Sequence, residues 1–360
     1  MTKQQEILIK LVRLGIITDL SGRYIFYNHP LTIDWDDLWD MAGRQGVSAI
    51  VLDGIEKMPQ TIRPPQETLL QWIGEVLQNY EARYEDYRHK IGKLAEFYNK
   101  HGYRMMVLKG YGLSLNYPKP SHRPCGDIDI WLFGKQKEAD SVISNECGIT
   151  VDKGHHHHTV FEWEDYTVEN HYDFVNVHYG HKNAELEISF KELAQDDTNV
   201  VVVDGQAVYL PSVNLHALFL LRHCMQDFAA AEMNLRQLLD WGFFVKKHTS
   251  EIDWKWLYQM LEQFKMKDFF NCINAICVEE LGFETSIFKT VQFCPEMKGK
   301  VLKDILAPQF SREEPMWLIP RLIYKYRRWK GNAWKQELCY SDSRVSSFFS
   351  GLWNHILKPS

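Results

Sequence analysis

The chain has 360 residues, of which 45% are hydrophobic and 24% are charged, and its formal net charge is −6. This composition is that of a globular protein with a sizeable core, and the weak negative charge does not imply a nucleic-acid partner. The first residues lack the basic-then-apolar order of a signal peptide, and no apolar run approaches about 18 residues. We therefore expect a cytoplasmic protein without an integral membrane segment. Seven dispersed cysteines without a Cys-x-x-Cys pair indicate reduced thiols.

The N-terminal part of the chain is predicted to be helical. Asp34 has the character of an N-cap residue, because apolar residues follow it at helical spacing. After a proline-containing break, an amphipathic pattern predicts one long helix from Gln66 to Lys100. His101-Gly102 ends that helix.

Between residues 101 and 210 the pattern changes to alternating strands and helices. Helices are predicted over 111–117 and 135–145, and strands over 103–108, 127–133, 158–163, 166–171, 185–190 and 199–210. Helical spacing returns after Pro211, including a helix that begins at Ile252-Asp-Trp254. We therefore divide the chain into an N-terminal helical region (1–100), an α/β core (101–210) and a C-terminal helical region (211–360).

Segment 123–132, with the sequence RPCGDIDIWL, places two carboxylates inside an apolar run. Asp127 and Asp129 are two residues apart, so on a strand both side chains point to the same face. Like charges side by side repel each other unless a cation lies between them, and oxygen ligands suit Mg²⁺ or Mn²⁺. The pattern predicts a site for metal-assisted phosphoryl or nucleotidyl transfer.

The order of a strand, Leu108-Lys-Gly, a short helix and then Arg-x-x-Gly-Asp-x-Asp on the next strand resembles the polymerase-β-type nucleotidyltransferase superfamily. Within it, the chain is similar to a bacterial branch of uncharacterised nucleotidyltransferases. The resemblance covers residues 103–175. It implies an α+β fold in which a small mixed-sheet nucleotidyltransferase core is flanked by N- and C-terminal helical regions. It also implies transfer of an NMP group from an NTP to a hydroxyl acceptor, with release of pyrophosphate.

The same resemblance implies roles for the acids. Asp127 and Asp129 would bind the Mg²⁺ or Mn²⁺ ions, and a third carboxylate would complete the set. Glu169 is the candidate, because the branch has an acid-x-His-aromatic sequence on the corresponding strand, and it can also act as base. Asp173 is the rival third acid. His171, two residues after Glu169, is a candidate supporting or acceptor-side group.

The turn after the first strand of the core is the expected phosphate site. Gly110 and Gly112 let the backbone approach a triphosphate, and the following helix presents free N–H groups. Lys109 and Arg123 flank the turn and can neutralise phosphates. Tyr111 stands where much of the superfamily has Gly or Ser. An alternative is therefore a catalytically degenerate fold, with Tyr111 in the triphosphate position, that serves as a nucleotide-binding or interaction module.

Seven of the fifteen histidines lie within residues 155–181, namely His155–His158, His171, His178 and His181. A transition-metal site, and with it a metallohydrolase, is a third interpretation. On a strand, however, alternate residues point to opposite faces, so at most two imidazoles of the run of four converge. No cysteine lies near enough to complete a tetrahedral zinc site.

In the C-terminal region, Arg236 and Asp240 are one helical turn apart. They are expected to form an ion pair, with substrate contact as the other interpretation. No motif in either helical region identifies the acceptor or the base of the nucleotide.

Overall fold

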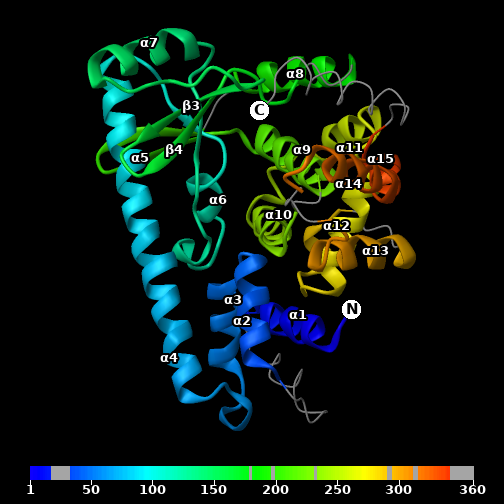
Figure 1. Ribbon diagram of the computed structural model, residues 1–360. Helices are drawn as coiled ribbons and strands as arrows, with labels where there is room; N and C mark the ends of the chain where they lie inside the picture. The colour runs from blue at the N-terminus through cyan, green and yellow to red at the C-terminus, as the bar shows by residue number, and fades with distance from the viewer. Residues whose placement is uncertain are drawn as a thin grey trace.

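A mixed sheet of six strands lies at one end of the molecule, and helices from both ends of the chain lie beside it (Figure 1). The structure is a computed structural model that describes residues 1–17, 33–177, 181–195, 199–230, 233–289, 294–310 and 315–340. The predicted α+β class, a small mixed sheet flanked by helical regions, is confirmed.

The chain begins with α1 (Lys3–Ile16), α2 (Trp35–Arg44) and α3 (Ser48–Lys57). Helix α2 starts at its predicted cap, because Asp34 Oδ1 accepts a hydrogen bond of 3.1 Å from the Asp37 N–H. Helices α1 and α3 approach so closely that only glycine fits where they meet. A Cβ atom on Gly15 would lie 2.2 Å from the Ile50 carbonyl oxygen, and one on Gly54 would lie 2.3 Å from a carbonyl of α1.

The predicted helix from Gln66 to Lys100 is a continuous rod along one side of the molecule (Figure 1). It consists of α4 (Gln66–Glu75), a π-helical segment (Val76–Ala82) and α5 (Arg83–Lys100). The buried face of α5 packs on the sheet, and together with α7 (Gln136–Cys147) it forms the smaller of two apolar clusters.

The sheet has the strand order β3-β4-β2-β1-β6-β5. The strands are β1 (Met106–Val107), β2 (Ile128–Trp131), β3 (His158–Trp163), β4 (Tyr166–His171), β5 (Asn199–Val203) and β6 (Gln206–Leu210). Strand β2 is parallel to β4 and β1 is parallel to β6, whereas the other neighbours are antiparallel. The short helix α6 (Tyr111–Ser114) follows β1.

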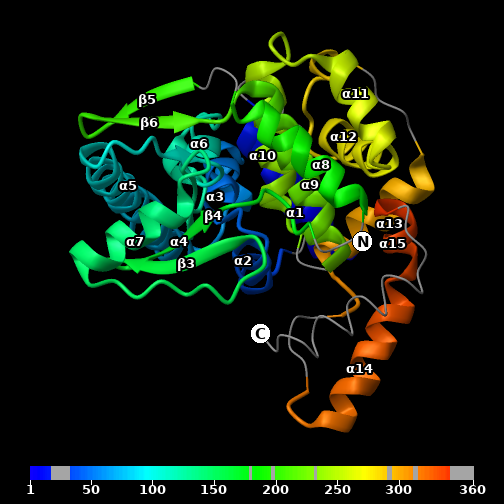
Figure 2. The ribbon, with the colours of Figure 1, turned by 90° about the horizontal axis from the view of Figure 1, so that it is seen from above.

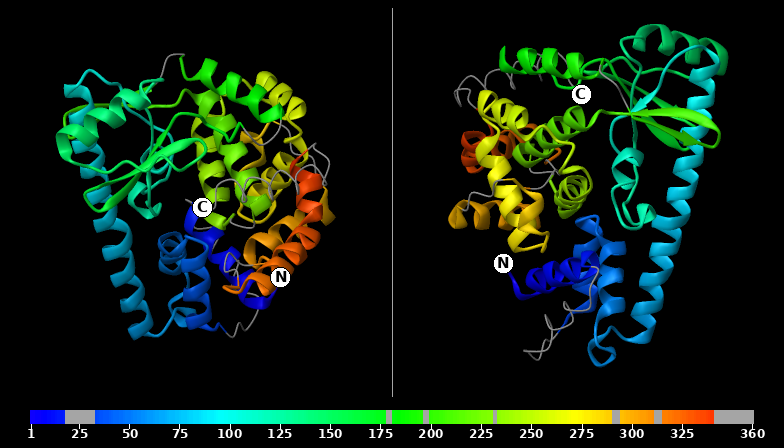
Figure 3. Two further views of the ribbon diagram at one scale, coloured as in Figure 1. Left: turned by 45° about the horizontal axis from the view of Figure 1, so that its top comes forward. Right: turned by 180° about the vertical axis from the view of Figure 1, so that it is seen from behind.

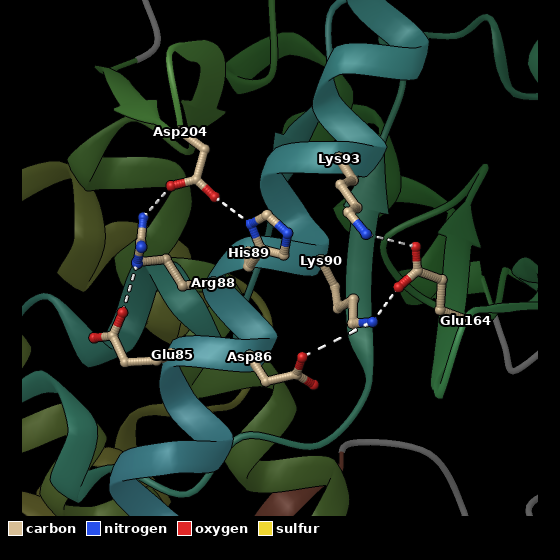
Figure 4. A network of polar contacts seen from close by, with 8 residues as sticks. All are labelled: Glu85, Asp86, Arg88, His89, Lys90, Lys93, Glu164 and Asp204. Atoms are coloured by element: carbon tan, nitrogen blue, oxygen red, sulfur yellow. Dashed lines mark hydrogen bonds and ion pairs between the residues drawn. The ribbon is translucent and has the colours of Figure 1, made fainter.

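Helix α5 contacts the turns of both outer hairpins of the sheet (Figure 4). Glu164 lies in the predicted turn between β3 and β4, and Asp204 lies in the turn between β5 and β6; their φ angles are 55° and 49°. Their partners on α5 are Arg88, His89, Lys90 and Lys93. Because the two hairpins form opposite edges of the sheet, one helix contacts both edges, although exposed ion pairs of this kind contribute little to stability.

The remaining helices cluster beside the sheet (Figures 2 and 3), and α14 extends away from the others (Figure 2). They are α8 (His181–Leu193), α9 (Val213–Ala230), α10 (Leu235–His248), α11 (Trp254–Gln263), α12 (Lys267–Glu279), α13 (Pro295–Leu306), α14 (Leu318–Gly331) and α15 (Ala333–Cys339). The larger apolar cluster joins α1–α3 with α9–α13. The N-terminal and C-terminal helical regions therefore share one apolar cluster. The division of the chain at residues 100 and 210 stays a prediction.

Two strand predictions between residues 185 and 210 are wrong. Residues 185–190 lie in helix α8, and residues 199–210 form a hairpin rather than one strand. The alternation of Leu186, Ile188 and Phe190 suggested a strand, yet Leu186 and Phe190 are buried one helical turn apart while Ile188 is 60% exposed. The hairpin turns at Asp204-Gly205, a dipeptide typical of tight two-residue turns.

None of the helices within the described ranges combines the length and the apolar composition that a bilayer-spanning segment needs.

The helical geometry of α8 predicts unequal effects from two similar truncations. Leu186→Ala removes a buried side chain and should lower the free energy of unfolding by about 2–5 kcal/mol. Ile188→Ala changes an exposed residue and should change it by less than about 0.5 kcal/mol. Urea unfolding of the two variants measures the difference. Equal losses would contradict the helix, because in a strand both side chains would point to the same face.

Candidate active site

Strand pairing places two of the predicted acids side by side. In the parallel register of β2 and β4, Asp129 lies opposite Glu169 and Trp131 opposite His171. Asp127 precedes β2 by one residue, and its side chain is exposed. The carboxylates of Asp129 and Glu169 and one His171 ring nitrogen lie within 4.8 Å of one another. The sheet therefore concentrates negative charge at one point.

The turn after β1 reaches the same point through an unusual backbone conformation. Gly110 has φ 53° and ψ −106°, and a Cβ atom there would lie 2.2 Å from the Tyr87 hydroxyl oxygen. That hydroxyl donates a 3.0 Å hydrogen bond to the Asp127 carbonyl oxygen. Glycine at position 110 therefore lets α5 hold the backbone at the start of β2.

Two cationic groups offset the charge of the acids. Lys109 Nζ lies 2.7 Å from Asp129 Oδ1, and His171 Nε2 lies 3.2 Å from Asp129 Oδ1 and 3.4 Å from Glu169 Oε2. Burial alone raises the pKa of Asp129, but the Lys109 charge and the His171 hydrogen bond outweigh it, so this pKa falls well below its usual range. Although Asp127 is accessible to solvent, its partial dehydration by the cavity walls and repulsion from Glu169 and Asp129 raise its pKa. The two acids are thus unequal, because the site lowers the pKa of Asp129 and raises that of Asp127.

These groups line a cavity of about 400 Å³ between the sheet and the helices that follow it. Its charged and polar lining residues are Lys109, Arg123, Asp127, Asp129, His157, His158, Glu169, His171, Arg222, His223, Gln226, Asp227 and Arg236. Phe174, Val175 and Phe219 form an apolar part of the wall. Most of the lining is charged or polar, so the cavity suits a charged ligand.

Helix α9 contributes residues that the sequence analysis missed. His223 Nε2 lies 3.0 Å from Lys109 Nζ, and His223 Nδ1 lies 3.0 Å from Asp227 Oδ2. Arg222 is buried, and its Nη1 has no hydrogen-bond partner among the described residues. A usable signal existed, because residues 222, 223, 226 and 227 are polar positions at helical spacing in an otherwise apolar run.

Arg123 and Asp240 form a buried pair that replaces the expected one. Arg123 Nε and Nη2 donate to Asp240 Oδ1 and Oδ2 at 2.7 and 3.0 Å, and the Tyr117 hydroxyl donates to Oδ1 at 2.8 Å. The predicted Arg236–Asp240 pair is therefore wrong, since the bidentate arginine takes the carboxylate. Arg236 lines the cavity instead, and its buried Nε has no partner among the described residues.

Three predicted residues lie away from the cavity. Tyr111 is buried against Tyr84, with ring centroids 6.2 Å apart, and Gly112 faces Leu210. Neither lines the cavity, whereas Gly110 does. Asp173 forms an ion pair with Lys191 and is also absent from the lining. Of the two rival third acids, only Glu169 therefore lies beside Asp129.

The histidine run contributes two imidazoles to the cavity, but these are adjacent residues rather than the alternate ones that a strand would bring together, because His157 precedes β3. His157 and His158 line it together with His171. Burial, and secondarily the charge of His171, lowers the pKa of His157 to about 3. Burial lowers the pKa of His158 to about 4. His178 and the side chain of His181 lie outside the described residues.

Helix α8 holds the segment that follows β4. Glu187 is buried, and its Oε2 accepts hydrogen bonds from the Phe174 and Val175 N–H groups at 2.9 and 3.0 Å. Burial raises the pKa of Glu187 to about 7. Because Phe174 and Val175 line the cavity, this carboxyl group positions part of its wall.

Comparison with known proteins gives a family. Residues 32–282 match the model of a family described as uncharacterised nucleotidyltransferase. Among solved structures, the chain is similar to an antigenic nucleotidyltransferase-like protein from Paracoccidioides brasiliensis, with 11% sequence identity and a TM-score of 0.34. That match covers 56% of this chain and 96% of the other. Comparison with curated proteins gives no match.

The contact between position 110 and Tyr87 predicts a double-mutant result. Gly110→Ala should lower the free energy of unfolding by about 3 kcal/mol or more, because backbone strain and a steric clash add. In a Tyr87→Phe background the loss should be smaller by about 1 kcal/mol or more, because the closest clashing atom is gone. Urea unfolding of the four proteins in this cycle measures both values.

Gly134→Ala is the matched control for that cycle. Gly134 has φ 81°, but a Cβ atom there meets nothing within 4 Å. Its replacement should therefore cost about 1–2 kcal/mol from backbone conformation alone, whatever residue is at position 87. Equal losses for Gly110→Ala in both backgrounds would contradict the clash with the Tyr87 hydroxyl.

The raised pKa of Glu187 predicts a pH dependence of stability. In the unfolded chain this carboxyl titrates near 4.5 and in the fold near 7, so its stabilising contribution is complete below pH 4.5 and is lost as pH rises to 7. Relative to Glu187→Gln, the wild type should lose about 2–3 kcal/mol between pH 5 and 8. Unfolding of both proteins in this range measures the difference; a constant difference would show that Glu187 has no raised pKa.

Proposed function

The chain belongs to the uncharacterised nucleotidyltransferase family, and on this basis we propose that its cavity is the active site for transfer of an NMP group. The donor is an NTP, the acceptor is a hydroxyl group, and pyrophosphate is released. The observation that carries the proposal is the placement of Asp127, Asp129 and Glu169 around one cavity with Lys109. Carboxylates that share a site with a basic side chain suit phosphoryl chemistry with a divalent cation.

The residues fit Mg²⁺ or Mn²⁺ by their chemistry. Asp127 and Asp129 would hold the cation, and Glu169 would complete the oxygen donors. Loss of hydration in the cavity and repulsion from Glu169 and Asp129 raise the pKa of Asp127, and a bound cation would relieve the repulsion. When bound, a dication neutralises phosphate charge and makes a hydroxyl more acidic.

The phosphates would be held chiefly by side chains of the sheet turn and of two helices. Lys109 follows β1, Arg222 lies on α9 and Arg236 lies on α10, and all three line the cavity. Arg222 Nη1 and Arg236 Nε are buried N–H donors without partners among the described residues. An unpaired buried donor costs about 1–3 kcal/mol, so an anion at this position is favoured. Arg123, a predicted phosphate ligand, has its guanidinium committed to Asp240.

Glu169 is the proposed base. Its carboxylate faces the cavity, and His171 Nε2 contacts it at 3.4 Å. Although burial raises the pKa of Glu169, the His171 hydrogen bond outweighs burial and lowers it. An ionised carboxylate can accept a proton from the acceptor hydroxyl. His171 would position Glu169 rather than transfer the proton.

The alternative of a non-catalytic nucleotide-binding or interaction module depended on Tyr111 occupying the triphosphate position. Tyr111 packs against Tyr84 in the apolar cluster of α5 and does not line the cavity. This packing favours the catalytic proposal over the alternative.

Calorimetry with each of the four NTPs, in the presence of Mg²⁺ or Mn²⁺, tests the proposal. The wild type should bind at least one NTP in a cation-dependent manner. Asp127→Ala/Asp129→Ala should abolish this binding, and the exposed Asp127→Ala alone should weaken it without loss of fold. Absence of cation-dependent binding by the wild type would contradict the proposed function. Binding without NMP transfer to any hydroxyl acceptor would favour the non-catalytic module.

The same titrations test the proposed phosphate ligands. Arg222→Gln and Arg236→Gln should each weaken NTP binding about tenfold or more, because a charged hydrogen bond contributes about 1.5–3 kcal/mol. Arg88→Gln is the matched control, since Arg88 lies on α5 and pairs with Asp204 outside the cavity (Figure 4). Equal affinity of all three variants would exclude the two arginines as phosphate ligands.

A further inference from the structure

Three imidazoles converge where β3 begins and β4 ends. His158 lies opposite His171 in the antiparallel register of β3 and β4, and His157 immediately precedes β3. The ring centroids of His157 and His158 are 4.4 Å apart, and those of His158 and His171 are 5.2 Å apart. One ring nitrogen from each of the three lies within 4.8 Å of the other two. We call this set the imidazole triad.

Two members of the imidazole triad carry buried nitrogens that lack partners. The Nδ1 atoms of His157 and His158 are shielded from solvent and make no hydrogen bond among the described residues. His158 is only 9% exposed. A buried polar atom normally has a partner, and leaving one unpaired costs about 1–3 kcal/mol. Two such atoms on neighbouring rings point to a ligand that accepts nitrogen lone pairs.

We propose that His157, His158 and His171 bind a transition-metal dication of the Zn²⁺ class. Three imidazole nitrogens form a donor set that borderline-soft ions prefer, whereas Mg²⁺ prefers oxygen. The triad lines the cavity, so an ion can enter and the site can keep a position for a further ligand. Three protein ligands and an accessible cavity are typical of zinc sites that act on a substrate.

His155, another histidine of the run, is not a member of the imidazole triad. His155 is largely exposed, and its Nε2 lies 3.3 Å from Asp152 Oδ2. Its ring stacks on His158, with centroids 4.8 Å apart, but it is not one of the three converging donors. The proposed site therefore consists of two residues of the run, His157 and His158, and of His171 from β4.

Metal titration of the full chain, after treatment with a chelator, tests the proposal. Co²⁺ serves as the spectroscopic probe, because nitrogen ligation gives visible absorption bands, and Zn²⁺ is added in competition. The wild type should bind one Co²⁺ per chain and release it to Zn²⁺. His157→Gln and His158→Gln should each weaken binding about 100-fold or more, since even the loss of a group that only supports a ligand weakens metal binding about 10–100-fold. Circular dichroism confirms that each variant is folded.

His155→Gln is the matched control, because it removes an imidazole from the same run. It should bind Co²⁺ within about twofold of the wild type, given its place outside the converging donors. Equal weakening by all three variants, or absence of stoichiometric binding in the wild type, would overturn the proposal. Asp127→Ala should retain Co²⁺ binding, so failure of the nucleotide experiment and failure of this one are separate outcomes.

Discussion

The structure around the cavity must compensate two like charges. The parallel pairing of β2 and β4 places the carboxylates of Asp129 and Glu169 opposite each other, where they repel. Neither acid can remain ionised in a partly buried position without nearby positive charge. Lys109 from the turn after β1 and His171 from the end of β4 supply it. The tight turn at Gly110 matters because it brings Lys109 to this point.

The helices that follow the sheet complete the cavity. His223 on α9 contacts Lys109, and Arg123, just before β2, is bound bidentately by Asp240 on α10. Both contacts join residues more than a hundred positions apart. Removing either partner of the buried Arg123–Asp240 pair would leave an unpaired charge, which typically costs about 3–5 kcal/mol. The cavity wall and the packing of the sheet against the helices therefore depend on the same hydrogen bond and the same ion pair.

The sequence predicted those features that local pattern determines. Asp-x-Asp in an apolar run located β2, and the strands predicted over 158–163 and 166–171 are β3 and β4 with the same bounds. Prediction failed where tertiary contacts outweighed local rules. Leu186 and Phe190 pack as one face of a helix despite an alternating sequence, and Asp240 pairs with distant Arg123 rather than Arg236 on its own helix. The spacing of Arg222 and His223 marks a polar face of α9, but nothing local in the sequence shows that this face meets the turn at Lys109.

His171 connects two kinds of donor set. One ring nitrogen converges with those of His157 and His158, and one lies near the oxygens of Asp129 and Glu169. Imidazole nitrogens bind transition-metal ions preferentially, and carboxylates bind hard ions such as Mg²⁺. The two donor sets share His171, but they select different ions. An imidazole that binds a metal must be unprotonated, whereas an imidazole that offsets two carboxylates is most effective when protonated. An ion on the imidazole triad would therefore leave Lys109 as the main cation beside Asp129, so the charge available to the proposed nucleotide site depends on the protonation of this one side chain.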